Sequence, residues 1–132
     1  MIALLDTHSF LWAVIEPRKL SAKVRKTIAD PDNEVHLSTV SFWEISLKFA
    51  LGKLELTGCT PEDLVAVARD MALVISAPSA EDAAGFHRLP RTMHKDPFDR
   101  MLIWLCLQHR WTFLTRDEGL DDYRSLGLKT FW

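Results

Sequence analysis

Apolar residues in this chain occur in two kinds of segment, short continuous runs and longer stretches with helical spacing. A short apolar run is typical of a strand that is buried on both faces of a parallel sheet. Such runs predict strands at residues 2–5, 35–37, 73–75 and 112–115, and a fifth at 128–132. Capping residues and prolines mark the helices between them. Helices are expected at 9–15, 22–29, 41–51, from 60 onward, from 79 to about 87, and at 96–109.

Strands that alternate with helices indicate an α/β fold with a mainly parallel central sheet of about five strands, flanked by helices. The chain has 132 residues, which suits one domain. We find no linker, internal repeat or low-complexity segment. The expected organisation is therefore a single domain over residues 1–132.

Composition narrows the class of protein. Apolar residues make up 48% and charged residues 26%, which excludes a mainly disordered or collagen-like chain. Even the longest apolar run, 101–107, is far short of the roughly 20 residues of a membrane-spanning helix. The first residues lack a basic segment and a cleavage site, so no signal peptide is expected. Two cysteines without metal-ligand spacing, Cys59 and Cys106, indicate a reduced, cytoplasmic protein.

Four acidic residues occupy positions that adjoin apolar elements. Asp6 follows the first predicted strand and Asp117 follows the fourth, at the strand ends where parallel sheets bind ligands. Glu44 lies within an otherwise apolar helix, and Asp99 lies in the first turn of another. The order of elements can bring all four to one edge of the sheet.

Each acid also has a local explanation. Ser41 and Glu44 have the spacing of a capping box. Asp99 lies near a helix N-terminus, where the helix dipole favours an acid. Asp6 and Asp117 are ordinary turn residues after strands. For any one of them alone, the local structural role is the better interpretation.

Taken together, the four acids favour a metal site. Carboxylates about 4 Å apart repel one another by several kcal/mol at an intermediate dielectric, so protons, bases or cations must offset the repulsion. Oxygen ligands select hard divalent cations such as Mg²⁺ or Mn²⁺. Histidine and cysteine do not recur at the spacing of a zinc site. A divalent cation held by carboxylates suits phosphoryl chemistry, because it lowers the pKa of bound water and neutralises phosphate charge.

The net charge of −2 argues at first against a nucleic-acid partner. Setting the four acids aside leaves 16 basic and 14 acidic residues, so the remaining surface is slightly positive. Basic residues gather just before and inside the last long helix, where a phosphate backbone can lie. A solvated loop explains the same cluster equally well. Its members are Arg88, Arg91, His94, Lys95 and Arg100.

Four sequence blocks, in this order, resemble the PIN-domain ribonuclease family, and most closely the VapC-type toxins of bacterial toxin–antitoxin modules. The blocks are LLDTH at 4–8, SFWEI at 41–45, HKDPFDRMLI at 94–103 and LTRD at 114–117. The resemblance spans the whole chain, including the final Phe131 and Trp132. Each block alone is weak, but four in sequence at these intervals are specific.

The resemblance implies a metal-dependent endoribonuclease. Carried over by position, the acids that bind Mg²⁺ or Mn²⁺ and support RNA hydrolysis are Asp6, Glu44, Asp99 and Asp117. Three further residues are possible helpers of the site. Asp96 either tunes the site through a water or only caps its helix, and the proline that follows favours the cap. The hydroxyls of Thr7 and Thr115 either contact metal-bound water or phosphate or serve as ordinary turn hydroxyls. His8 and His94 are interpreted as structural or surface residues.

The same resemblance implies partners. These are RNA as substrate, a small antitoxin whose C-terminal segment covers the acidic cleft, and a second copy of the chain in a homodimer; no membrane partner is expected. Two other functions stay open. One is a PIN-like module that binds RNA or protein without cutting it. The other is a Mg²⁺-dependent phosphatase for small phosphorylated molecules, although His8 stands where such an enzyme has a second Asp and no glycine-rich phosphate loop is present.

Overall fold

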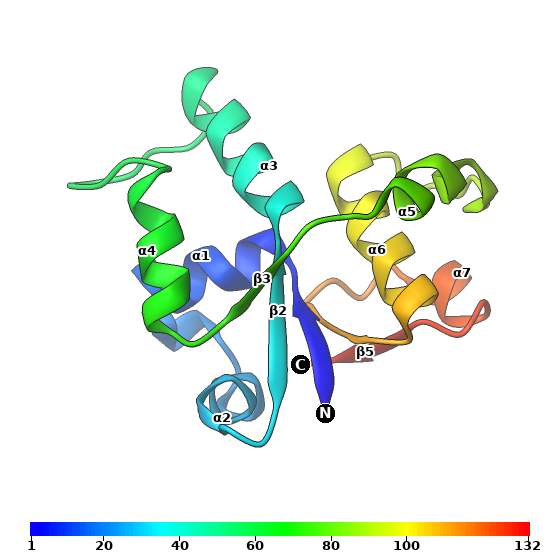
Figure 1. The fold of residues 1–132 in the computed structure, drawn as a ribbon, viewed down its shortest axis with the longest axis horizontal. Helices are drawn as coiled ribbons and strands as arrows, with labels where there is room; N and C mark the ends of the chain where they lie inside the picture. Colours follow the sequence, from blue (N-terminus) through cyan, green and yellow to red (C-terminus); the bar gives the residue numbers. More distant parts are fainter.

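The computed structural model describes residues 1–132 and is built around a five-stranded sheet in which every neighbouring pair is parallel. The strands lie in the order β3-β2-β1-β4-β5. Their bounds are β1 Ile2–Leu5, β2 Glu34–Ser38, β3 Val74–Ser76, β4 Thr112–Leu114 and β5 Lys129–Phe131. All five expected strands are present, and the predicted α/β class is confirmed (Figure 1).

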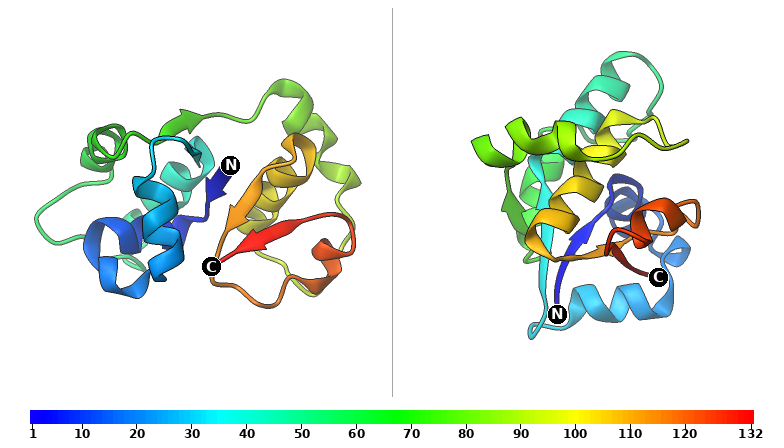
Figure 2. Two further views of the ribbon diagram at one scale, coloured as in Figure 1. Left: turned by 90° about the horizontal axis from the view of Figure 1, so that it is seen from below. Right: turned by 90° about the vertical axis from the view of Figure 1, so that its right-hand side faces the viewer.

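Helices connect the strands and lie on both sides of the sheet. Helices α1 to α4 are grouped on one side and α5 to α7 on the other (Figure 2, left). The bounds are α1 Thr7–Ile15, α2 Ala22–Ala29, α3 Thr39–Ala50, α4 Asp63–Asp70, α5 Ala80–Gly85, α6 Pro97–His109 and α7 Asp121–Arg124, with single 3₁₀ turns η1 Pro17–Lys19 and η2 Phe86–Arg88. The short α7 and η1 were not predicted. No helix has both the length and the apolar composition needed to cross a membrane.

Strand β1 divides the interior into two apolar cores. Ala3 and Leu5 point into the core formed with α1, α3 and α4, whereas Leu4 points into the core formed with α6 and α7. All three side chains are completely buried. This two-sided burial explains why β1 is a continuous apolar run rather than an alternating one.

Local capping sets where the two site-bearing helices begin. Asp96 caps α6 as expected, since its carboxylate accepts hydrogen bonds from the backbone N–H groups of Phe98 (2.8 Å) and Asp99 (3.2 Å). The capping box predicted for Ser41 and Glu44 is wrong. Ser38, the last residue of β2, caps α3 instead, so the strand passes into the helix without a loop and Ser41 lies inside the helix.

The sheet reverses its winding beside β1. The chain builds β2 and β3 on one side of β1 and then crosses over to add β4 and β5 on the other. In open parallel sheets, the crevice at such a reversal is where ligands bind. Asp6 follows β1 there, and its backbone N–H donates to Leu114 O at 3.2 Å, which places it beside Thr115 after β4.

Candidate active site

Three carboxylates converge where α3 packs against the first turn of α6. One oxygen from each of Glu44, Asp96 and Asp99 lies within 4.8 Å of the others. Helix packing fixes this spacing, because the Trp43 ring meets the Phe98 ring edge-on with 5.1 Å between their centroids. We call Glu44, Asp96 and Asp99 the carboxylate triad.

Glu44 is the most buried member of the triad, with only 1% of its surface exposed. Its Oε2 accepts a hydrogen bond from the Lys48 ammonium, one helical turn further along α3. Its Oε1 is buried and has no hydrogen-bond partner. A buried charged oxygen without a partner is costly, which indicates that something absent from the isolated chain satisfies it.

Crowding of negative charge changes the protonation of the triad. Burial, followed by the charges of Asp96 and Glu44, raises the pKa of the Asp99 carboxyl to about 6. Burial by itself lowers the pKa of Lys48, but the hydrogen bond and charge of Glu44 outweigh it, so the pKa of Lys48 is raised. The triad therefore attracts positive charge, and Lys48 supplies one such charge.

The other two acids of the predicted quartet, Asp6 and Asp117, lie outside the triad. Asp6 caps α1: its Oδ1 accepts from Ser9 N at 2.7 Å, and its Oδ2 accepts from Thr115 Oγ1 at 2.6 Å. Burial raises the pKa of Asp6 although these hydrogen bonds oppose the effect. Thr115 Oγ1 also accepts from Asp117 N at 3.1 Å, so one hydroxyl joins the ends of β1 and β4.

His94 connects Asp117 to the triad. Its Nε2 lies 3.2 Å from Asp99 Oδ2, and its Nδ1 lies 3.8 Å from Asp117 Oδ2. The ring is half-buried and meets the Tyr123 ring edge-on. The sequence pattern favours a structural or surface role for His94, and the structure places its ring between Asp99 and Asp117. Its position two residues before Asp96, in a block shared with the family, was the available signal.

The two threonines of the prediction have different surroundings. Thr7 is buried, and its Oγ1 donates to Ser41 Oγ at 2.9 Å, which ties the start of α1 to α3. Thr115 contacts both Asp6 and Asp117. Thr7 therefore acts through packing of the two helices, whereas Thr115 contacts the acids directly.

The predicted basic cluster divides into residues that hold the loop and residues that are free. Arg100 donates to the carbonyls of Leu89 (3.1 Å) and Pro90 (3.3 Å), and Arg88 lies over the Trp104 ring at 5.5 Å. Arg91 and Lys95 are exposed. A cavity of about 280 Å³, which we call the basic pocket, adjoins the acids through His94. Its lining is Arg91, Thr92, His94, Lys95 and Arg100.

The triad fits a hard divalent cation. All its donors are carboxylate oxygens, and one oxygen of Glu44, Oε1, is buried without a hydrogen-bond partner. The predicted local roles do not compete with this fit, because Asp96 caps α6 through Oδ1 alone and retains a second oxygen.

Comparison with known proteins gives the same family for nearly the whole chain. The PIN domain profile matches residues 3–126. Ribonuclease VapC22 of Mycobacterium tuberculosis is 28% identical over 129 residues, which cover 98% of this chain and 97% of that protein.

Solved structures show the same fold at low sequence identity. VapBC2 from Rickettsia felis, bound to a promoter DNA fragment, superposes with a TM-score of 0.73 at 15% identity, over 99% of this chain and 98% of that one. FitAB bound to a DNA fragment superposes with a TM-score of 0.67 at 22% identity, over 99% of this chain and 94% of that one. VapBC-1 from nontypeable Haemophilus influenzae superposes with a TM-score of 0.66 at 14% identity, over 99% of this chain and 97% of that one. Because the PIN domain profile matches residues 3–126, this chain belongs to the PIN-domain family.

Proposed function

We propose that this protein is a metal-dependent endoribonuclease and the toxin of a type II toxin–antitoxin module. The observation that carries the proposal is the carboxylate triad with its unpartnered Glu44 oxygen, in a chain of the PIN-domain family. The similarity to Ribonuclease VapC22 supports RNA as the substrate.

In this proposal, Glu44, Asp96 and Asp99 hold a divalent cation, Mg²⁺ or Mn²⁺. When bound, the cation supplies Lewis acidity, which activates a water for attack on the RNA phosphodiester and offsets charge on the phosphate. Asp6 and Asp117 complete the acidic cleft. Thr115 holds Asp6 in place, and His94 holds Asp117 near Asp99.

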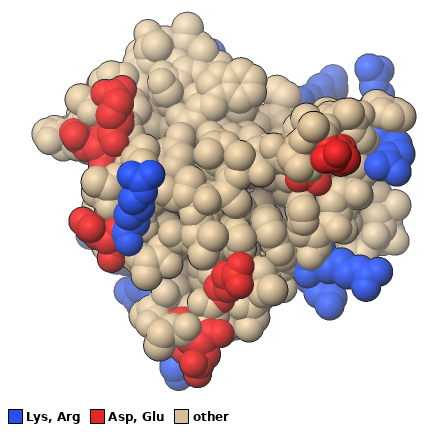
Figure 3. Space-filling model, in the orientation of Figure 1, with Lys and Arg blue, Asp and Glu red and all other residues tan.

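The basic pocket gives the RNA backbone a place to bind. Arg91 and Lys95 are exposed beside His94, and phosphate contacts by such residues position a nucleic acid without reading its sequence. Arg100 shapes the pocket by holding the backbone of residues 89 and 90. In Figure 3, Lys and Arg side chains lie along the right-hand edge of the molecule, in separate groups near α5 and below it.

The test is cleavage of end-labelled total RNA by the isolated protein, with Mg²⁺ or Mn²⁺ and with EDTA. Discrete products that require the metal are expected from the wild type. Asp99→Asn should abolish them, whereas Asp32→Asn, at an exposed turn far along the chain, should not. Equal cleavage by Asp99→Asn would contradict the assignment of the site. Binding of RNA without any cleavage would favour the non-catalytic module instead.

We also propose a small antitoxin as partner and a homodimer as the working unit. Apolar side chains on the outer face of α3 support a protein partner near the cleft, since Trp43 is 64%, Leu47 39% and Leu51 59% exposed. The test is inhibition of RNA cleavage by the protein encoded next to this one, together with the mass of each species in solution. Leu51→Ser, which leaves the contact of Trp43 with Phe98 intact, should weaken the inhibition.

A further inference from the structure

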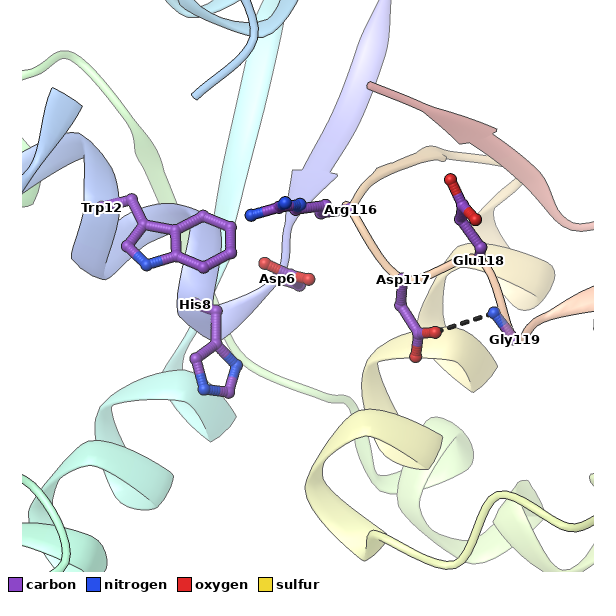
Figure 4. A pocket seen from close by; sticks show the side chains of 7 residues that line it. All are labelled: Asp6, His8, Trp12, Arg116, Asp117, Glu118 and Gly119. Carbon is purple, nitrogen blue, oxygen red and sulfur yellow. Dashed lines mark hydrogen bonds between the residues drawn. The ribbon is translucent and has the colours of Figure 1, made fainter. Parts of the chain in front are cut away.

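An open cavity of about 660 Å³ lies at the reversal of the sheet, between the start of α1 and the loop after β4 (Figure 4). Asp6 forms its floor. Trp12 and His8 of α1 stand on one side, and Arg116 and Asp117 on the other. His94 joins Asp117 to Asp99 and to the basic pocket, and Glu44 lies near His8, with which it lines a second cavity. A polymer that follows the basic pocket past the acids therefore reaches this cavity next.

The Trp12 ring has cations near its faces but no ring stacked on it. Arg116 Cζ and Lys19 Nζ each lie 5.9 Å from the ring centroid. The nearest aromatic neighbours, Trp132 at 5.9 Å and His8 at 6.1 Å, are tilted by 68° and 47° rather than parallel. In Figure 4, the Arg116 side chain extends across Asp6 toward the Trp12 ring. The exposed Arg116 can therefore move aside and admit a planar group.

We propose that Trp12 and Arg116 form a subsite that clamps one unpaired RNA base beside the scissile phosphate. Aromatic rings and guanidinium planes are the two surfaces on which proteins stack unpaired bases. A base between them needs two stacking distances of about 3.5 Å, so Arg116 must move outward by about 1 Å. This inference rests on the proposed ribonuclease function and adds a substrate requirement to it.

The charges of the cavity favour a base over a phosphate at this position. Asp6, Asp117 and Glu118 contribute three carboxylates against the single guanidinium of Arg116. A phosphate group would be repelled there, while a neutral planar base gains stacking and a cation–π contact. The basic pocket has the opposite composition and suits the phosphates. The basic pocket thus suits the backbone of a single RNA strand, and the cavity beside Trp12 suits one of its bases.

The subsite predicts that this protein binds and cuts RNA at unpaired nucleotides. A base inside a duplex is stacked on its neighbours and cannot enter a one-base clamp without the cost of unstacking. Loop and single-stranded segments are therefore the expected substrates, and a fully paired version of the same sequence is expected to resist cleavage.

The experiment measures anisotropy of a labelled ten-nucleotide single strand that carries a cleavage site, with Asp99→Asn protein in Mg²⁺ so that the strand stays intact. Because stacking of one base contributes about 1–3 kcal/mol, adding Trp12→Leu should weaken binding about 5- to 150-fold. Trp12→Phe keeps a stacking face and should lose less than threefold. Arg116→Ala should weaken binding severalfold. Trp111→Leu, at the opposite end of the sheet, is the matched control and should change nothing.

If Trp12→Leu fails to fold, a second measurement uses an RNA strand that lacks the base next to the cleavage site. The abasic strand should bind the Asp99→Asn protein more weakly, and Trp12→Phe or Arg116→Ala should then cause no further loss, because both changes remove the same contact. Equal affinity of all variants for the intact strand would overturn the subsite while leaving the ribonuclease proposal standing. A wild-type protein that neither binds nor cuts RNA would overturn both.

Discussion

The carboxylate triad and the Asp6–Asp117 pair lie side by side but are stabilised in different ways. Both oxygens of Asp6 accept hydrogen bonds from within the protein, and Asp117 accepts one from Gly119 N at 2.8 Å. In the triad, three acids crowd together and Glu44 Oε1 has no partner. Both carboxylate oxygens of Asp6 thus have hydrogen-bond partners, whereas one carboxylate oxygen of Glu44 has none.

This difference suggests two roles: Asp6 helps to position the elements of the site, and the triad binds the cation. Hydrogen bonds to Asp6 fix its carboxylate and hold α1 against β4, although burial still raises the pKa of Asp6. The triad has unsatisfied oxygens and mutual repulsion, and a divalent ion relieves both. The following experiments separate these two roles, starting with the largest expected effect.

Loss of Glu44 should affect the metal most. Glu44→Gln keeps the shape of the side chain but removes a ligand charge, and should weaken Mn²⁺ binding at least about 100-fold, since even residues behind the ligands cost 10- to 100-fold. Asp117→Asn should weaken Mn²⁺ binding less than about tenfold. Titration followed by Mn²⁺ electron paramagnetic resonance measures both, with exposed Glu55→Gln as the control. Equal losses at Glu44 and Asp117 would remove the distinction between the two sides.

Two substitutions of Asp6 separate its structural role from its chemical role. Asparagine caps helices as well as aspartate, so Asp6→Asn should keep the melting temperature and still lose at least about tenfold in RNA cleavage. Asp6→Ala should lose the cleavage and, in addition, about 1 kcal/mol of stability. Thermal unfolding and RNA cleavage rates of Asp6→Asn and Asp6→Ala measure the two roles separately. A stable Asp6→Ala protein would show that the cap to Ser9 contributes little.

Acid should weaken metal binding through Asp99. Below its pKa of about 6, a proton must leave Asp99 before the cation binds, so the Mn²⁺ affinity should fall about tenfold per pH unit below 6 and level off above 7. The folding stability of the metal-free protein should depend on pH with the opposite sign. The folded state binds this proton more tightly than the unfolded chain, so stability falls as pH rises from about 4 to about 6. Asp99→Asn should remove the pH dependence of Mn²⁺ affinity and reduce that of stability, to which the buried Asp6, whose pKa is also raised, contributes.

Lys48 should have the smallest effect on the metal and an effect of opposite sign. Its ammonium occupies Glu44 Oε2 and repels a dication, so Lys48→Met should tighten Mn²⁺ binding severalfold. The metal-free protein should lose about 1–3 kcal/mol, because a buried carboxylate is left unpaired, with the loss moderated by the partial exposure of Lys48. Saturating Mn²⁺ should restore most of the melting temperature. Weaker Mn²⁺ binding would instead make Lys48 a residue that positions Glu44.

Features set by neighbouring residues were predictable from the sequence. Asp96 followed by Pro97 places the start of α6, and the apolar run at 2–5 gives β1 with its stated bounds. The sequence pattern predicts the start of α3 at residue 41, two residues later than Thr39, because Ser38 and Ser41 are equally good caps. Only the length of β2 selects Ser38, and strand length depends on pairing with β1 and β3.

Contacts between distant segments account for the rest. The pairing of Glu44 with Lys48 was visible as an i,i+4 spacing and was overlooked. The place of Asp96 in the triad depends on how α6 packs against α3, which no local pattern encodes. The roles of His94 and Trp12 depend on the crossover that brings the loop after β4 beside α1.

The central claim is that a divalent ion binds at Glu44, Asp96 and Asp99. A crystal of the isolated protein soaked in Mn²⁺ tests it most directly, through the anomalous scattering of the metal. We expect one strong anomalous peak within about 2.0–2.3 Å of oxygens from all three carboxylates, including Glu44 Oε1. A peak held only by Asp6 and Asp117, with the triad empty at saturating Mn²⁺, would contradict the account.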